Sequence, residues 1–466
     1  MPVKKKIPFV KKLVSVKKPK PKTETVSNKK DVSVARRSKR TPELLRGFRD
    51  LLPEEQKYWE KIRDLASRFA ESYSFQRIDL PILEQEDLFI RTVGKDTDVI
   101  EKEMYTFIDL GGERVALRPE ATASVARAYI NHGMLDRPQP VKLFYIGPMF
   151  RHDRPQAGRY RQFCQMGFES IGQVDPIVDA QLIVIGYHFF RELGLDITVH
   201  LNSIGTPETR KAYINELVRY FRSHRQKLSE DDKRRLNKNP LRLLDSKEEY
   251  MPDLLKEAPQ ILDWLDEESK THFMQVLDYL DGSEIPYLLN QHLVRGLDYY
   301  TRTVFEFWLS NDEGDRAQNA LGGGGRYDGL VELLGGREGT PGCGFAIGID
   351  RVVGIMREKQ LAGKEPVYQI FFAQLGEAAR RQGLRLFEEF RREGVSVAEA
   401  FSRSALKAQL DYANKLGVSH TLILGQKEVL DGTIIIRDME SGAQEIVDSQ
   451  KVIAIVKKKL GFSISA

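Results

Sequence analysis

The feature that most constrains this chain is the segment 150–169, FRHDRPQAGRYRQFCQMGFE, in which an arginine-rich loop runs into an alternating sequence. The sequence before it, KLFYIG, favours a strand, so two strands would flank the loop. Such a loop can bind phosphate groups, although a basic loop taken alone is more typical of a solvated hairpin tip. The arginines of the loop are Arg151, Arg154, Arg159 and Arg161.

The return strand after the loop makes a binding site the better interpretation. Successive side chains of a strand point to opposite faces. Cys164, Met166 and Phe168 therefore share an apolar face that should pack against the protein. The opposite face contains Gln165 and Glu169. We predict that this amide and this carboxylate form the floor of a pocket for phosphates and a small zwitterion.

Composition limits the class of protein. The chain has 466 residues, 41% hydrophobic and 30% charged, as expected of a soluble protein with two or more domains. No apolar run approaches the roughly 20 residues that cross a bilayer. The two cysteines, Cys164 and Cys343, are far apart and form no CxxC pair. This argues against a zinc site or a disulfide scaffold, and it fits a reducing, cytoplasmic location.

Basic charge is concentrated at the N-terminus. Residues 1–40 carry 15 Lys and Arg against Glu24 and Asp31. Because the whole chain has a net charge of only +5, residues 41–466 are net acidic. We expect this extension to be disordered. Its role stays open between an arm that holds RNA phosphates and a solubilising extension, with an organellar targeting segment as the weaker option.

Regular structure is predicted from Thr41 onward. The sequence Thr41-Pro42-Glu43 has the pattern of a helix start, and Pro53 opens a long amphipathic helix. The other elements predicted before residue 291 are a strand interrupted by Pro81, a hairpin turning at 111–112, a helix over 174–194, a strand over 197–203 and a mostly helical, charged stretch over 205–290.

Two polar residues, Glu120 and Thr122, lie where a predicted strand gives way to a helix. Such junctions commonly bind ligands. An acid and a threonine in these positions can equally cap the helix, and this segment alone favours capping.

The sequence LVRGLDYYTRTVFEFW, residues 293–308, places an arginine beside two tyrosines. We predict a strand over 303–308, preceded by a turn that contains Arg295, Tyr299 and Tyr300. A buried arginine is costly unless it is paired with an anion, so the pattern indicates a site that faces a carboxylate or a phosphate. A surface turn with an Arg295–Asp298 pair is the alternative.

Two segments rich in small residues follow. The glycines of GGGGRYDGLVELLGG, residues 322–336, indicate either a backbone that closely approaches another group or a flexible turn, and the P-loop lysine is missing. PGCGFAIGIDRVV, residues 341–353, favours a strand that runs into a helix. One face of that strand holds only glycine and alanine, which leaves room for a flat ring, and Arg351 at the helix start can reach a phosphate.

The C-terminal part of the chain alternates strands and helices from residue 367. This order favours a mixed, largely parallel sheet. A linker over 361–366 is predicted to precede it.

Together these motifs resemble class II aminoacyl-tRNA synthetases, and most closely the histidyl-tRNA synthetases. RPQAGRYRQFCQ resembles motif 2 of the class, RPEATA its RPEGTA sequence with Ala121 in place of glycine, and RGLDYY the histidine-specific motif. The segment around Pro81 resembles motif 1, which forms the dimer interface, and 341–353 resembles motif 3. NPLRLLDSK resembles the helical insertion of bacterial-type members, which sits over the acceptor arm of tRNA.

The resemblance implies an α+β fold. It predicts an antiparallel-sheet catalytic domain over 41–363, with a helical insertion at about 205–290, and an α/β anticodon-binding domain over 367–466. The implied activity is that of a histidine–tRNA ligase, which activates histidine with ATP and Mg²⁺ and transfers it to the 3′ end of tRNA(His). The implied assembly is a homodimer without a membrane partner.

The resemblance also implies residue roles. Arg151 and Arg295 would be catalytic cations at the α-phosphate, and no residue is assigned as a metal ligand because ATP phosphates would hold Mg²⁺. The remaining implied roles are ATP binding for Arg151, Arg159 and Arg351, carboxylate binding for Arg295, ammonium binding for Glu120, Thr122 and Glu169, and an imidazole pocket formed by Gln165, Tyr299, Tyr300 and Tyr327.

Two other functions stay open for such a sequence. The histidine-binding regulatory subunit of ATP phosphoribosyltransferase is similar through the catalytic fold, but it typically lacks the C-terminal domain and an intact RGLDYY sequence. A catalytically inactive, RNA-binding relative would not need Arg151, Arg295 and Arg351, all of which are present.

Overall fold

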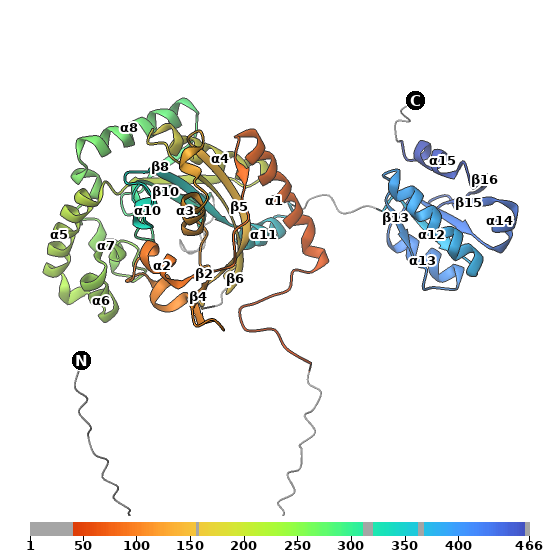
Figure 1. Cartoon of the computed structure of the whole chain (residues 1–466), viewed down its shortest axis with the longest axis horizontal. Coiled ribbons are helices and arrows are strands. Elements are labelled where there is room, and N and C mark those ends of the chain that lie inside the picture. Colours follow the sequence, from red (N-terminus) through yellow and green to blue (C-terminus); the bar gives the residue numbers. More distant parts are fainter. Residues whose placement is uncertain (1–40, 155–157, 311–319, 362–367, 462–466) are drawn as a thin grey trace, which may run out of the picture. The chain divides into compact units, whose positions relative to one another are not determined.

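The computed structural model describes residues 41–154, 158–310, 320–361 and 368–461 (Figure 1). The predicted N-terminal extension, residues 1–40, and all but the first residue of the predicted linker lie outside the described residues.

An eight-stranded sheet forms the centre of the larger part of the chain. Its inner strands pair antiparallel, and only the two edge strands, β1 and β8, join in parallel. This confirms the α+β class with an antiparallel catalytic sheet. The strands in spatial order are β1 (Gln76–Arg77), β5 (Val141–Phe150), β6 (Gln162–Ile171), β11 (Gly342–Gly348), β10 (Ala320–Arg326), β9 (Thr301–Leu309), β7 (Ile197–Ser203) and β8 (Tyr287–Leu289).

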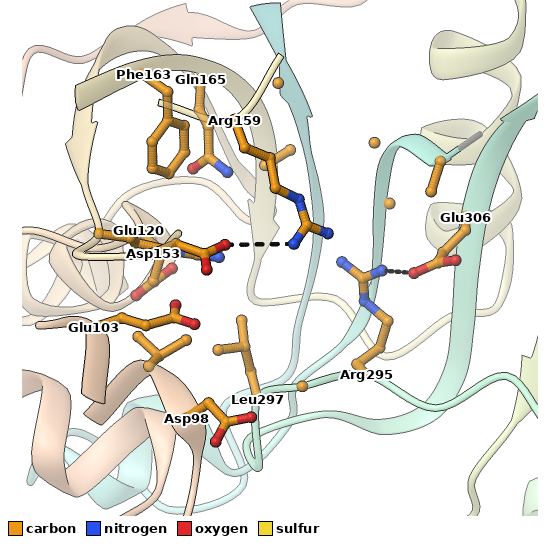
Figure 2. A pocket seen from close by; sticks show the side chains of 18 of the residues that line it. Asp98, Glu103, Glu120, Asp153, Arg159, Phe163, Gln165, Arg295, Leu297 and Glu306 are labelled. Carbon is orange, nitrogen blue, oxygen red and sulfur yellow. Dashed lines mark hydrogen bonds and ion pairs between the residues drawn. The ribbon is translucent and has the colours of Figure 1, made fainter. Parts of the chain in front are cut away.

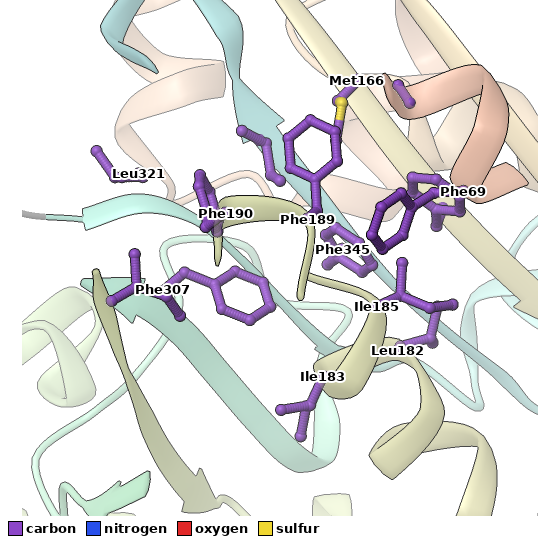
Figure 3. Packing of buried hydrophobic residues seen from close by; sticks show 14 of the residues in the cluster. Phe69, Met166, Leu182, Ile183, Ile185, Phe189, Phe190, Phe307, Leu321 and Phe345 are labelled. Atoms are coloured by element: carbon purple, nitrogen blue, oxygen red, sulfur yellow. The ribbon is translucent and has the colours of Figure 1, made fainter. Parts of the chain in front are cut away.

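Helices bury one face of this sheet in a large apolar core (Figure 3). Phe168 of β6 stacks on Phe345 of β11, with ring centroids 5.3 Å apart. A Cβ on Gly186 would collide with the ring of Phe307, so glycine lets the helix approach the sheet closely. With this face of the sheet buried, a ligand site is restricted to the other face. The helices of the core are α1 (Pro53–Ser72), α4 (Ile177–Leu193), α8 (Glu267–Gly282) and α11 (Ile349–Glu358).

The predicted hairpin and the predicted helical stretch are both present. The hairpin belongs to a three-stranded sheet. The helix that begins at Thr122 follows the hairpin in the chain. The elements of this region are β2 (Leu83–Gln85), α2 (Glu86–Val93), β3 (Tyr105–Ile108), β4 (Arg114–Leu117) and α3 (Thr122–Asn131). The insertion contains α5 (Pro207–Ser223), α6 (Glu230–Lys238) and α7 (Met251–Leu255) before α8.

One local prediction was wrong. No helix begins at Thr41, and the first helix among the described residues starts at Pro53. Gly47 has a φ of +87°, which a continuing helix does not allow.

The glycines at 322–325 lie in β10, near the middle of the sheet, and the short helix α10 (Leu330–Leu333) follows. A Cβ on Gly324 would collide with the Gly344 backbone oxygen, which confirms the predicted close approach of the backbone and excludes the alternative of a flexible turn.

The C-terminal part of the chain contains a five-stranded sheet. It is mixed rather than largely parallel, because two of its four strand pairs are antiparallel. The connections 425–432 and 439–443 are too short for the crossover that parallel strands need. In chain order the elements are β12 (Ile370–Gln374), α12 (Glu377–Arg392), β13 (Val397–Glu399), α13 (Leu406–Lys415), β14 (His420–Leu424), α14 (Gln426–Asp431), which was not predicted, β15 (Thr433–Asp438), β16 (Gln444–Asp448) and α15 (Val452–Lys459).

Candidate functional site

A cavity of about 890 Å³ lies over the face of the large sheet that the helical core leaves uncovered. Strands β6, β9, β10 and β11 contribute to its lining, together with loops and the insertion. The structure brings most of the predicted site residues together here. Those that line the cavity are Glu120, Thr122, Arg151, Arg159, Gln165, Arg295, Tyr299, Tyr300 and Arg351.

Glu120 caps the start of a helix and also lines the cavity. Its carboxylate accepts hydrogen bonds from the backbone N–H groups of Thr122 (2.7 Å) and Ala123 (2.9 Å) at the start of α3, which confirms the capping interpretation. The same side chain faces the cavity (Figure 2). Burial raises the pKa of Glu120, and the backbone N–H groups and the charge of Arg151 oppose this. The carboxylate is thus fixed in place and accessible to a ligand.

Glu169 and Tyr327 do not line the cavity but lie directly behind its wall. Glu169 is 1% exposed and accepts hydrogen bonds from the hydroxyls of Tyr327 (2.6 Å) and Thr122 (2.7 Å). Burial raises the pKa of Glu169 to about 8, so the two hydroxyl groups do not stabilise the ionised carboxylate as a neighbouring cation would. A Cβ on Gly344 would collide with this carboxylate, which explains one of the small residues on β11.

Arg295 lies in the cavity and pairs with Glu306 of β9, not with Asp298. The alternative of a surface turn with an Arg295–Asp298 pair is therefore wrong. Burial alone would lower the pKa of Arg295, but the Glu306 carboxylate and the hydroxyls of neighbouring tyrosines raise it above its ordinary value. Its Nε is buried and has no hydrogen-bond partner among the described residues.

Sequence reasoning assigned no role to Glu306. The signal was present, because a single carboxylate interrupts the apolar strand sequence TVFEFW. Trp308 donates its indole N–H to the second oxygen of Glu306 at 2.9 Å. Both oxygens of this carboxylate are therefore engaged at the edge of the cavity.

The other three arginines reach the cavity from the motif 2 region and from α11. Arg151 is held through its Nε, which donates to the Pro119 carbonyl at 2.9 Å. Arg159 pairs with Asp153 at 3.4 Å, and Figure 2 shows Arg159 and Arg295 extending into the pocket from different elements. Burial and the positive charge of Arg159 lower the pKa of Arg351, which indicates a site short of negative charge.

The insertion also contributes to the cavity, which the sequence did not reveal. Arg242 pairs with Asp98 at 2.6 Å, and Lys238 pairs with Glu101 at 2.6 Å. These pairs join the insertion to the segment 98–103 beside the cavity. Nothing in the local sequence marks these residues, because each pair joins positions more than a hundred residues apart. Further lining residues from the insertion are Arg235, Asp245, Ser246, Lys247 and Glu248.

The described residues contain neither a metal-binding cluster nor a membrane-spanning helix. No group of three or more His, Cys, Asp or Glu side chains in these ranges has the arrangement of a metal site. None of the helices that the structure describes is long and apolar enough to cross a membrane.

Comparison with known proteins identifies the two parts of the chain. The family described as histidyl-tRNA synthetase matches residues 47–352, and the family described as anticodon-binding domain matches residues 369–459. These ranges contain the eight-stranded and the five-stranded sheet, respectively.

Individual relatives cover nearly the whole chain. The histidine–tRNA ligase of Dehalococcoides mccartyi is 44% identical over 417 residues, which are 89% of this chain and 99% of the relative. That of Desulfotalea psychrophila is 46% identical over 401 residues, 86% of this chain and 92% of the relative. The crystal structure of apo histidyl-tRNA synthetase from S. aureus has a TM-score of 0.74 and 36% identity, and the match covers 90% of this chain and all of that one. The chain therefore belongs to the histidyl-tRNA synthetase family, and its activity is that of a histidine–tRNA ligase.

Proposed function

We propose that the cavity performs both steps of the ligase reaction. The carboxylate of histidine attacks the α-phosphate of ATP, the bond to the bridging oxygen breaks, and pyrophosphate leaves. The histidyl group then passes from AMP to the 3′ end of tRNA(His). The observation that supports this proposal is that Arg295 lines the cavity while its buried Nε has no hydrogen-bond partner among the described residues. An unpaired buried donor is costly, so an anion that accepts from it is strongly favoured.

The arginines would supply the charge that this reaction needs. Two anions must be held in line while negative charge moves to the leaving oxygen, so positioned cations lower the barrier. We assign Arg151 and Arg295 to the α-phosphate and the histidine carboxylate. Arg159 and Arg351 would hold the distal phosphates, and ATP would enter with Mg²⁺ on its phosphates.

The opposite side of the site would recognise histidine. Glu120 and Thr122 would accept hydrogen bonds from its ammonium group, and Glu169 would hold Thr122 in position from behind the wall of the cavity. The Oε1 of Gln165 is buried without a partner among the described residues and would accept from the substrate. A site that hydrogen-bonds a polar ring can reject apolar analogues strongly, so an editing domain is unnecessary.

We further propose the context in which this enzyme works. Apolar side chains are exposed in the segment that resembles motif 1 and in the hairpin that follows α2, and their burial in a homodimer would remove them from water. The domain over 367–466 would contact the anticodon of tRNA, and the cytoplasm is the expected location. The exposed side chains are Ile82, Leu83, Phe107, Ile108 and Leu110.

The test is ATP–pyrophosphate exchange by the full chain and by Arg295→Ala. We expect exchange with histidine alone among the amino acids, and a loss of about 10²- to 10³-fold in the variant, the usual cost of removing a group that stabilises transition-state charge. Arg385→Ala is the matched control, because Arg385 is an exposed arginine that pairs with Glu389 on α12.

Each of the other outcomes would favour a different function or remove Arg295 from the mechanism. Histidine binding without exchange would contradict the adenylation site and favour a regulatory subunit. Neither histidine binding nor exchange would leave the RNA-binding alternative, for which tRNA binding with and without residues 1–40 is the next measurement. Full exchange by Arg295→Ala would remove Arg295 from the catalytic set.

A further inference from the structure

The guanidinium of Arg295 lies between a carboxylate and an aromatic ring. One of its Nη atoms donates to Oε1 of Glu306, while its buried Nε has no partner among the described residues. The Cζ atom lies 5.6 Å from the ring centroid of Tyr300. The side chains of Arg295 and Glu306 are 20% and 17% exposed, so both are largely dry but reachable from the cavity. The pairing thus fixes the guanidinium without consuming all its donors.

Glu306 is itself fixed from behind. The indole N–H of Trp308 donates to its second oxygen at 2.9 Å. The Trp308 ring stacks on His200 of β7, with centroids 4.3 Å apart and an interplanar angle of 17°. His200 in turn contacts the side-chain amide of Asn290 at 3.4 Å. A flexible carboxylate is therefore held by rigid aromatic groups on two neighbouring strands.

The neighbouring strand β10 makes room for this arrangement. A Cβ on Gly323 would lie 2.6 Å from the backbone carbonyl oxygen of Phe305, 2.8 Å from the Arg295 Nη1 atom and 3.0 Å from Cγ of Glu306. A side chain at this position would therefore collide with strand β9 and also with the pair. The close approach of β9 and the pair together explain this glycine.

We propose that Glu306 is a positioning residue for Arg295 in the adenylation step, and that Trp308 fixes Glu306 for this purpose. Glu306 holds one Nη atom, so that Nε and the other Nη face the histidine carboxylate and the α-phosphate. This inference rests on the role proposed above for Arg295. Glu306 itself touches no substrate in this arrangement and acts only through the arginine.

The charge of the pair determines how loss of Glu306 should change the kinetics. Glu306→Gln removes the negative charge but keeps the size and an acceptor for the Trp308 N–H. Arg295 then keeps its full positive charge toward anionic substrates, while its orientation is no longer fixed. We expect kcat for exchange to fall by up to about 10²-fold, the cost of a small misplacement, while KM for histidine and ATP stays unchanged or falls. Trp308→Phe keeps the stack on His200 and should give a smaller change in the same direction.

The experiment measures kcat and KM of exchange, with thermal unfolding, for wild type, Arg295→Ala, Glu306→Gln, Trp308→Phe and the double variant Arg295→Ala/Glu306→Gln. Because Glu306 acts through Arg295, the double variant should be no slower than Arg295→Ala. Glu268→Gln is the matched control, since Glu268 is 74% exposed and pairs with Arg302 outside the cavity lining.

The outcomes separate this inference from the function on which it rests. If Arg295→Ala keeps full exchange, the proposed role of Arg295 fails and this inference fails with it. If Arg295→Ala loses exchange but Glu306→Gln keeps its kcat, the inference alone is overturned. A rise in KM with a parallel loss of thermal stability in Glu306→Gln would assign Glu306 a merely structural role, as would additive losses in the double variant.

Discussion

Asp179 and Glu169 are both almost completely buried, but the groups that surround them differ. Asp179 of α4 is 0% exposed and pairs with the equally buried guanidinium of Arg326, with His272 as a further partner at 3.4 Å. Glu169 is 1% exposed, and its hydrogen-bond partners among the described residues are hydroxyl groups. Consecutive residues connect the two clusters, because Arg326 contacts Asp179 and Tyr327 contacts Glu169.

The difference appears in the pKa values. Burial alone would raise the pKa of Asp179, but the charge of Arg326 and the hydrogen bond from His272 lower it to about 2. Burial raises the pKa of Glu169 to about 8, against the opposing effect of its hydroxyl partners. The opposite charges of Asp179 and Arg326 thus compensate each other inside the protein, and we call these two residues with His272 the closed cluster. Glu169 and its hydroxyl partners among the described residues form the open cluster, which contains no cation. Thr122 connects the open cluster to the cavity, where a cationic substrate group would supply the missing charge.

The largest expected effect comes from breaking the closed cluster. Asp179→Asn removes the carboxylate closest to the buried Arg326 guanidinium and leaves it the Asp328 carboxylate at 3.2 Å, so we expect a loss of up to about 3–5 kcal/mol of unfolding free energy. Urea unfolding followed by tryptophan fluorescence measures this, because the chain's tryptophans, Trp59, Trp264 and Trp308, all lie in the larger part of the chain. Glu268→Gln, which removes one partner of an exposed pair, should cost about 0–1 kcal/mol. Equal losses in the two variants would contradict a closed, structural cluster.

The next effect distinguishes the two carboxylates by pH. The folded pKa of Glu169 lies above its ordinary value of 4.5, so the native state binds the additional proton between about pH 4.5 and 8. Its contribution to stability therefore falls as pH rises through this window. The folded pKa of Asp179 lies below its ordinary 3.8, so its contribution is complete above that pH and is lost toward pH 2.

Glu169→Gln tests the sign of this pH dependence. A neutral amide replaces an acid that is already neutral at low pH, so we expect little change near pH 5 and a variant that becomes relatively more stable as pH approaches 8. The difference in urea midpoint between the variant and wild type, measured from pH 5 to 8, isolates Glu169 from other titrating groups. A difference that stays constant over this range would show that Glu169 is ionised in the free protein.

The sequence predicted one of these clusters better than the other. Strand alternation placed Gln165 and Glu169 on the face opposite Met166 and Phe168, and the structure buries the apolar pair in the core. Such alternation is local, so it can be read from the chain. Asp179 and Arg326 are 147 residues apart, and neither neighbourhood contains a sign of the other.

Local patterns alone did not settle every element. The helix-start pattern at Thr41 was local, but Gly47 adopts a left-handed conformation and no helix forms. The glycines of β10 left a flexible turn open beside a close backbone approach, because glycine weakens strands. Their neighbours in three dimensions, including the Arg295–Glu306 pair beside Gly323, require the absence of side chains. Local patterns thus predicted the elements, while contacts between strands decided what each residue does.

The smallest expected effect comes from the third member of the closed cluster. His272→Phe keeps an aromatic ring of similar size but removes the hydrogen bond to Asp179, while Arg326 still pairs with the carboxylate. We therefore expect a loss of about 1 kcal/mol, the net value of one hydrogen bond, and unchanged pyrophosphate exchange, because His272 does not line the cavity. The same urea experiment, combined with exchange kinetics, measures both quantities. A loss as large as that of Asp179→Asn would mean that α8 of the insertion, and not Arg326 alone, holds the buried carboxylate. A loss of exchange without a loss of stability would mean that the closed cluster also positions Tyr327 and Glu169 for catalysis. The two carboxylates would then no longer have separate roles.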